Sequence, residues 1–349
     1  MWAVPLAALR RNFMARVYVI AEAGVNHNGS ADLALQLVKA AKDCGADAVK
    51  FQTFRADRIA SKSTMKAQYQ ERQTSKTESH FEMLQRLELS AEVHQQLIER
   101  CRQINIDFLS SPFDEGSVDL LDALGVAQFK VPSGEITNLP LLQYIAEKGR
   151  PVILSTGMAT LGEVEEAVSA LQGAKTVPIT LLHCVTEYPA PVGEINLRAM
   201  QTLQSAFRLP VGYSDHTEGI EIAVAAVALG AQVIEKHFTL DRSLPGPDHA
   251  ASLEPAALKQ MVAAIRNVES ALGDGIKGPA PCEMPNIQVA RKSVIATRDL
   301  PAGHQLRAED LAIKRPGNGI APKFLKLLSG HTLRRGVNED EIIRWNDLA

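Results

Sequence analysis

A short apolar or β-branched segment followed by an amphipathic stretch recurs eight times in this chain, and this alternation limits its fold more than any other feature. The predicted strands are residues 17–24, 48–54, 107–113, 128–133, 151–157, 179–185, 210–216 and 233–239. Because a helical pattern follows most of these strands, consecutive strands should be parallel and joined by right-handed crossovers. Eight such units within about 250 residues predict an α/β fold, a closed (β/α)8 TIM barrel rather than an open doubly wound sheet.

The repeating pattern stops after Gly273, and this break predicts how the chain divides into domains. We expect an N-terminal extension at 1–14, a barrel at 15–273, a Gly/Pro-rich linker at 274–289 and a small module at 290–349. A long polar insert at 59–89 separates the second and third predicted strands, and we expect it to fold over the barrel mouth. Thr160 and Glu163 are spaced as a capping box that opens the helix after the fifth strand.

Charge, hydropathy and cysteine usage exclude several classes of function. A net charge of −3 does not favour a nucleic-acid partner. No apolar run reaches the roughly 18–20 residues that span a bilayer, so no membrane association is expected. The four cysteines, Cys44, Cys101, Cys184 and Cys282, have no paired spacing, which is typical of reduced thiols and predicts a cytoplasmic protein.

Polar side chains gather at the ends of the predicted strands, where barrels of this class hold their active sites. Lys50, Lys130 and Lys236 lie on apolar strands, and unpaired buried lysines are unfavourable. The strand ends also carry several hydroxyls, at Ser111, Ser133, Ser155, Thr186 and Ser214. Lysines and hydroxyls converging on one mouth predict a site for an anion with both phosphate and carboxylate groups, although any one lysine could be a solvated rim residue.

Histidines and carboxylates at the same ends suggest a metal site and acid–base chemistry. His216 and His237 come from adjacent strands, so their rings could meet and hold a divalent transition metal. Alternatively, each could be a core histidine whose hydrogen bonds are satisfied by a neighbouring residue. His27, His183 and His249 are further candidates that spacing does not rank. Glu22, Glu135 and Glu235 are candidate acids or bases, or partners for the lysines.

Eight segments resemble one known family, the sialic acid synthases. These segments are AEAGVNHNGS at 21–30, VKFQTF at 49–54, FKVPSGE at 129–135, ILSTGM at 153–158, LHCVTEYP at 182–189, GYSDHT at 212–217, IEKHFTLD at 234–241 and KRPGNG at 314–319. The resemblance runs from about residue 16 to the C-terminus. It implies a TIM barrel followed by an antifreeze-like SAF domain of β-clip fold, assembled as a domain-swapped homodimer.

The resemblance also implies a reaction, metal-dependent condensation of phosphoenolpyruvate with an N-acylated amino sugar, catalysed by a C–C bond-forming transferase. Carried over residue by residue, it assigns catalytic roles to Glu22, His216 and His237, with His216 and His237 holding Mn2+, or else Mg2+ or Co2+. Phosphoenolpyruvate would bind Lys50, Ser111, Lys130, Ser133, Ser155, Thr186 and Ser214. The sugar would contact Glu22, Gln52, Tyr188, Asp248 and Arg315, with Arg315 reaching into the partner's site.

Alternative functions remain open at this level. The first expectation is an N-acetylneuraminate synthase that uses N-acetylmannosamine. The alternative is an N,N′-diacetyllegionaminate synthase that uses 2,4-diacetamido-2,4,6-trideoxymannose, and the segment ITNLP at 136–140 leans toward it. More remote are a Schiff-base aldolase with Lys130 or Lys236 as nucleophile, and a non-catalytic sugar-binding protein.

Overall fold

The computed structural model describes residues 16–67, 70–71, 74, 77–173 and 175–349. The predicted extension at 1–14 lies outside the described residues. The chain forms two compact units that divide between Asp274 and Gly275. The first unit carries the eight predicted strands, and the second carries the predicted C-terminal module.

Eight parallel strands build the first unit, each within three residues of its predicted bounds. They are β1 (Tyr18–Gly24), β2 (Ala48–Thr53), β3 (Asp107–Pro112), β4 (Phe129–Val131), β5 (Val152–Ser155), β6 (Ile179–Cys184), β7 (Val211–Asp215) and β8 (Val233–His237). The sheet order is β3-β2-β1-β8-β7-β6-β5-β4, and the end strands β3 and β4 pack against each other. The strands therefore form a TIM-like near-barrel, which confirms the predicted fold class.

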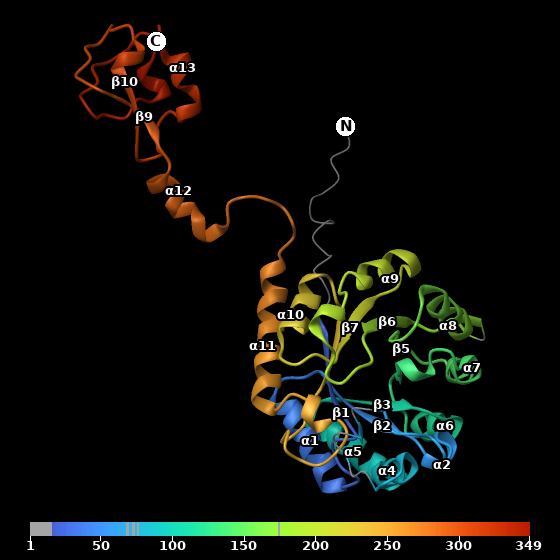
Figure 1. The fold of residues 1–349 in the computed structure, drawn as a ribbon. Coiled ribbons are helices and arrows are strands. Elements are labelled where there is room, and N and C mark those ends of the chain that lie inside the picture. The colour runs from blue at the N-terminus through green and yellow to red at the C-terminus, as the bar shows by residue number, and fades with distance from the viewer. Residues whose placement is uncertain (1–15, 68–69, 72–73, 75–76, 174) are drawn as a thin grey trace. The chain divides into compact units, whose positions relative to one another are not determined.

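Helices follow the strands and surround them (Figure 1). Among the described residues, the first unit has the α-helices α1 (Ala31–Asp43), α2 (Ala56–Ile59), α4 (His80–Leu87), α5 (Ala91–Ile104), α6 (Glu115–Ala123), α7 (Leu139–Glu147), α8 (Leu161–Gly173), α9 (Ala199–Phe207), α10 (Glu221–Ala228) and α11 (Pro255–Leu272). Their apolar faces pack on the outward side chains of the strands to form the main core. The predicted capping box is present, because the Thr160 N–H and hydroxyl both donate to Glu163 and the Glu163 N–H donates back to the Thr160 hydroxyl.

Along six of the strands, the inward-facing side chains change from apolar to polar over two residues. One layer contains only apolar side chains, from Ile20, Ala48, Leu109, Ile153, Leu182 and Val233. Successive side chains of a strand alternate between its faces, so the residues two positions further on also point inward. These residues are Glu22, Lys50, Ser111, Ser155, Cys184 and Glu235, and all are buried. The apolar layer thus closes the barrel beneath a polar layer.

In the described part of the insert between β2 and β3, helices α2 and α4 lie near the carboxyl ends of the strands. Helix α4 begins at a capping box in which the side chains of Ser79 and Glu82 each accept from the other's backbone N–H. Met83 and Leu87 of α4 are buried against Val25 and Phe54, which follow β1 and β2. The described part of this insert therefore packs on the barrel mouth, as expected.

The second unit contains α12 (Met284–Ala290), β9 (Ser293–Ala296), β10 (Leu311–Lys314) and α13 (Leu325–Leu328). Strands β9 and β10 are antiparallel, and a small apolar core of its own includes Val294, Leu306 and Leu333. Asp310 is fully buried and accepts hydrogen bonds from the side chain of Arg298 and the backbone N–H of Arg307. Within the described residues, no helix is long and apolar enough to cross a membrane.

Candidate active site

A cavity of about 320 Å3 opens at the carboxyl ends of the strands, where the sequence predicted the site. Every barrel residue to which the family resemblance assigns a role lines it: Glu22, Lys50, Gln52, Ser111, Lys130, Ser133, Ser155, Thr186, Tyr188, Ser214, His216, His237 and Asp248. Arg315 belongs to the second unit, where its Nε donates to the Ala290 carbonyl at 3.1 Å. Its predicted place in a partner's site stays a prediction.

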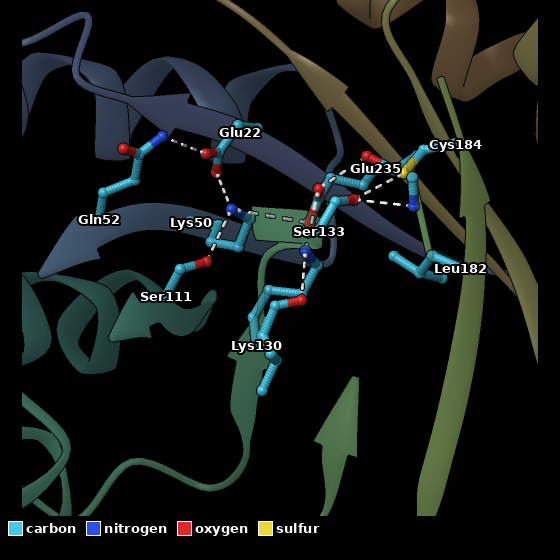
Figure 2. A network of polar contacts seen from close by, with 12 residues as sticks. Glu22, Lys50, Gln52, Ser111, Lys130, Ser133, Leu182, Cys184 and Glu235 are labelled. Carbon is cyan, nitrogen blue, oxygen red and sulfur yellow. Dashed lines mark hydrogen bonds and ion pairs between the residues drawn. The ribbon is translucent and has the colours of Figure 1, made fainter. Parts of the chain in front are cut away.

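Two buried lysines and two buried glutamates form a charge cluster at the floor of the cavity (Figure 2). Lys50 Nζ lies 2.8 Å from Glu22 Oε2 and 3.7 Å from Glu235 Oε2. Lys130 Nζ lies 3.5 Å from Glu235 Oε1. Opposite charges attract one another in the low-dielectric interior, and this attraction offsets part of the cost of burying them. The formal charge of the four side chains is zero when all are ionised.

Burial and neighbouring charges move the pKa values of this cluster in different directions. Burial raises the pKa of Glu22 to about 7, although Lys50 opposes the shift. Burial alone would also raise the pKa of Glu235, but Lys130 and Lys50 outweigh it and lower that pKa to about 2. Burial lowers the pKa of Lys130 despite the attraction of Glu235. Glu235 is therefore a permanent anion, while Glu22 can gain or lose a proton near neutral pH.

Small polar groups converge at the ends of β4 to β6. The Gly157 N–H donates to Ser133 Oγ at 3.0 Å, and Ser133 Oγ is hydrogen-bonded to Cys184 Sγ at 3.1 Å. Ser155 Oγ and Thr186 Oγ1 are buried without a hydrogen-bond partner among the described residues. A Cβ at position 157 would lie 2.3 Å from Thr186 Oγ1, so only glycine leaves this space open. Unpaired buried hydroxyls around a space indicate a cradle for a polar ligand.

Two neutral imidazoles face each other at the ends of β7 and β8. The rings of His216 and His237 have centroids 5.5 Å apart. Burial lowers the pKa of His216 to about 4 and, together with the neighbouring His216, lowers that of His237 well below its ordinary range. His216 Nδ1 donates to the Val185 carbonyl at 2.6 Å, which leaves the Nε2 lone pair available.

This pair fits part of a divalent-metal site. His237 Nδ1 is buried with no hydrogen-bond partner in the described chain, and Asp248 Oδ2 lies 3.7 Å from it. No group of three or more His, Cys, Asp and Glu side chains among the described residues is arranged to hold a metal ion. The protein therefore offers two nitrogen ligands and a nearby carboxylate, and any further ligands would come from substrate or water.

The residues that were expected to contact the sugar lie beside this pair. The Tyr188 ring stacks on His216 with centroids 4.2 Å apart. Gln52 Nε2 donates to Glu22 Oε1 at 3.4 Å. Burial raises the pKa of Asp248 to about 6, against the charge of Lys50. The Asp248 carbonyl accepts from Ser252 Oγ at 2.7 Å, and Ser252 Oγ accepts from Asn26 Nδ2 at 2.9 Å, which ties this loop to the segment after β1.

Several expectations from the sequence need correction. Lys236 does not line the cavity, because it alternates with Glu235 and His237 and points outward to Asp215 Oδ2 at 2.7 Å. The aldolase alternative therefore loses one of its two nucleophiles. His183 also points outward, with Nε2 2.7 Å from the Ile195 carbonyl.

Three further candidates also lie outside the cavity. Glu235 and Cys184, which line it, received too little weight in the sequence analysis. His27, His249 and Glu135 do not line the cavity. Glu235 is central to the charge cluster, and its position two residues before His237 could have identified it. Cys184 lines the cavity as well, which the same alternation predicts.

Comparisons with known proteins agree with this geometry. The NeuB family model matches residues 37–277, and the SAF domain model matches residues 291–349. The N,N′-diacetyllegionaminic acid synthase of Campylobacter jejuni is 53% identical over 95% of this chain and 100% of its own length. The synthase of the same name from Legionella pneumophila is 48% identical over 95% of this chain and 94% of its own.

Among solved structures, the N-acetylneuraminic acid synthetase of Leptospira borgpetersenii aligns with a TM-score of 0.69 and 39% identity, covering 78% of this chain and 90% of that one. The predicted resemblance and the predicted enzyme class are thereby confirmed. The expectation of an N-acetylneuraminate synthase is not confirmed, because the legionaminic acid synthases are the more similar relatives. The chain belongs to the NeuB family, carries a C-terminal SAF domain and is an enzyme of the synthase type.

Proposed function

We propose that this enzyme is an N,N′-diacetyllegionaminate synthase, which condenses phosphoenolpyruvate with 2,4-diacetamido-2,4,6-trideoxymannose. The observation that carries the proposal is one cavity in which buried lysines and unpaired hydroxyls lie beside a pair of neutral histidines. The identities of 53% and 48% to two N,N′-diacetyllegionaminic acid synthases support this acceptor over N-acetylmannosamine.

The cavity floor suits phosphoenolpyruvate, a small molecule with a phosphate and a carboxylate. Lys50 and Lys130 supply two positive charges. The cradle at the ends of β4 to β6 adds the Ser155 and Thr186 hydroxyls, which have no partner among the described residues, beside the space that Gly157 leaves open. Ser111, hydrogen-bonded to Lys50 at 3.2 Å, together with Ser133 and Ser214 completes the proposed set. Charge-assisted hydrogen bonds of this kind are about twice as strong as neutral ones.

The histidine pair supports a divalent cation, for which we propose Mn2+ with Mg2+ or Co2+ as alternatives. His216 and His237 would hold it, with Asp248 nearby. A metal ion bound there would supply Lewis acidity toward the aldehyde of the acceptor. The residues themselves would orient the acceptor, with the Tyr188 ring stacked on His216 as one wall.

In the proposed reaction, C3 of phosphoenolpyruvate attacks the aldehyde carbon and water adds to C2. The tetrahedral intermediate then loses phosphate by C–O cleavage and leaves the 2-keto acid. Lys50 and Lys130 hold the anionic groups so that the two carbons approach each other. Glu22, with its pKa near 7, is proposed to carry the proton at the new hydroxyl or the attacking water.

Glu22→Gln keeps the shape of this side chain and removes the proton carrier. We expect a fall in kcat of about 100-fold or more with a nearly unchanged KM for phosphoenolpyruvate. Steady-state phosphate release measures both constants. Turnover equal to that of the wild type would remove Glu22 from this role.

Assembly and location are also proposals. We propose a domain-swapped homodimer in which Arg315 of each SAF domain enters the partner's active site and binds the N-acyl group. Support comes from the exposed position of this arginine in its own unit. We propose a cytoplasmic location because all four cysteines are free thiols.

The decisive experiment uses purified full-length protein with phosphoenolpyruvate, Mn2+ and either acceptor sugar. Phosphate release and the mass of the product are recorded, with a chelated sample and a borohydride-treated sample as controls. We expect strong preference for the diacetamido sugar and loss of activity in chelator. Preference for N-acetylmannosamine would reverse the choice of substrate, and borohydride trapping at Lys130 would favour the aldolase.

A further inference from the structure

Helix α4 turns one face toward the cavity. His80, Met83, Leu84 and Leu87 all line it. Their spacing of three, four and seven residues places them along a single stripe of a helix. Gln85 and Arg86, on the other side, are exposed. The capping box at Ser79 and Glu82 fixes where the helix begins, so this stripe has a defined orientation.

The α4 stripe belongs to a mostly apolar wall beside β1 to β3. Met83 and Leu87 pack with Val25 and Phe54, and Leu84 packs against the same cluster. In the circular order of the strands, β2 stands opposite β6. The hydroxyl cradle at the ends of β4 to β6 therefore lies on the opposite side of the cavity. Beyond the charged floor, the cavity therefore has hydroxyl groups on one side and the apolar α4 stripe on the other.

One polar group interrupts the apolar wall. His80 Nδ1 is buried and has no hydrogen-bond partner in the part of the chain that is described. Burial and the ammonium group of Lys66 lower the pKa of His80, so its ring is neutral at pH 7. A buried ring nitrogen without a partner is unfavourable unless a ligand bonds to it.

We infer that the α4 stripe is the surface that selects the acceptor, by contacting the end of the sugar that does not react. This inference rests on the proposed function and deepens it. With phosphoenolpyruvate held by the floor lysines and the cradle at β4 to β6, and the aldehyde beside His216 and His237, the remaining end of the sugar faces the α4 stripe. The C6 methyl and the acetamido methyl then pack on Leu84 and Met83, and the 4-acetamido group bonds to His80 Nδ1.

The same wall disfavours N-acetylmannosamine. That sugar carries a hydroxyl at C6 in place of the methyl group, and this hydroxyl would lose its water against leucine and methionine side chains without gaining a partner. An apolar pocket rejects an added hydroxyl by roughly 100-fold in kcat/KM. Met83 is almost fully buried and also supports the packing of α4, so Leu84 and His80 are the better positions to test.

The test compares kcat/KM for the two acceptors in wild type, Leu84→Gln, His80→Ala and the matched control Gln85→Ala. Leu84→Gln offers hydrogen bonds to the hydroxyls and should reduce the preference for the diacetamido sugar about tenfold or more. His80→Ala should lower kcat/KM for that sugar about tenfold and for N-acetylmannosamine less than threefold. The KM for phosphoenolpyruvate should stay within about twofold in all variants, and Gln85→Ala should match the wild type.

Different outcomes separate this inference from the proposed function. An active wild type whose acceptor ratio is unchanged by both variants would overturn the role of α4 and leave the synthase assignment standing. An equal fall for both acceptors would do the same, because it indicates general damage. A wild type that releases phosphate with neither sugar would overturn both. If Leu84→Gln fails to fold, as judged by circular dichroism, the ratio measured for His80→Ala decides the question.

Discussion

Glu235→Gln removes one charge from the buried cluster and leaves its shape almost unchanged. The Ser214 hydroxyl donates to Glu235 Oε1 at 2.8 Å, and an amide oxygen can accept the same bond. The substitution removes the carboxylate that pairs with both Lys50 and Lys130, and Glu22, which pairs with Lys50, remains in the cluster. Four side chains that sum to zero charge would then carry a net positive charge in the barrel interior.

The expected loss of stability follows from two independent estimates. Removing one partner of a buried ion pair destabilises a protein by about 3–5 kcal/mol. The pKa of Glu235 falls from its ordinary 4.5 to about 2, and each tenfold change in an equilibrium constant is about 1.4 kcal/mol, which gives about 3 kcal/mol. For a unit of this size, about 3 kcal/mol lowers Tm by roughly 10 °C.

The pH dependence has a definite sign. Because the pKa of Glu235 is lower in the folded state, its stabilisation is complete above pH 4.5 and disappears as the pH falls through about 2. The difference between wild type and Glu235→Gln should therefore be largest at neutral pH and shrink in acid.

Thermal and urea unfolding of metal-free protein, followed by far-ultraviolet circular dichroism at several pH values, measures this difference. Glu218→Gln is the matched control, because Glu218 forms an exposed ion pair with Arg242 at 3.3 Å and its loss should have no measurable effect. A Glu235→Gln protein as stable as the wild type at pH 7 would refute the view that this carboxylate compensates the lysines.

Two further predictions concern the anion cradle and the second unit. Gly157→Ala places a methyl 2.3 Å from Thr186 Oγ1. It should raise the KM for phosphoenolpyruvate about 10- to 100-fold and leave the KM for the acceptor unchanged. An unchanged KM for phosphoenolpyruvate would mean that the anion binds elsewhere. Asp310→Asn should destabilise the second unit by about 2–3 kcal/mol in urea unfolding followed by Trp345 fluorescence. Burial alone would raise the pKa of Asp310, but hydrogen bonds from His304, Arg307 and Arg298 lower it to about 2. The loss of stability should therefore vanish as the pH falls from 3.8 through 2. A difference that does not depend on pH would contradict a stabilising role for the ionised Asp310.

Much of the barrel and its site could be predicted because the information is local. Alternation along a strand decides which side chains point inward, and the carboxyl ends of parallel strands meet at one mouth. Thirteen predicted residues therefore line one cavity although they lie far apart in the chain. Alternation applied to β8 would also have removed Lys236, which points outward between Glu235 and His237.

Other features depend on distances that only the tertiary structure supplies. Glu235 could be read as an acid, a base or a lysine partner until Lys50 and Lys130 were found 3.7 Å and 3.5 Å from its oxygens. The raised pKa of Glu22 and the lowered pKa of Glu235 likewise follow from burial and from which charges lie nearest, which two similar strand-end glutamates do not reveal in sequence.

The α4 wall was the least predictable part of the site. The polar insert indicated only a cover for the mouth. Its packing against Val25 and Phe54 turns a short apolar stripe inward and leaves His80 Nδ1 without a hydrogen-bond partner among the described residues. The sequence by itself determined the barrel, the order of the strands and the residues at their ends, because strand alternation and crossover handedness are local rules. Only the tertiary structure decided charge pairing, pKa direction and the wall of the acceptor pocket, because these depend on contacts between segments distant in the chain.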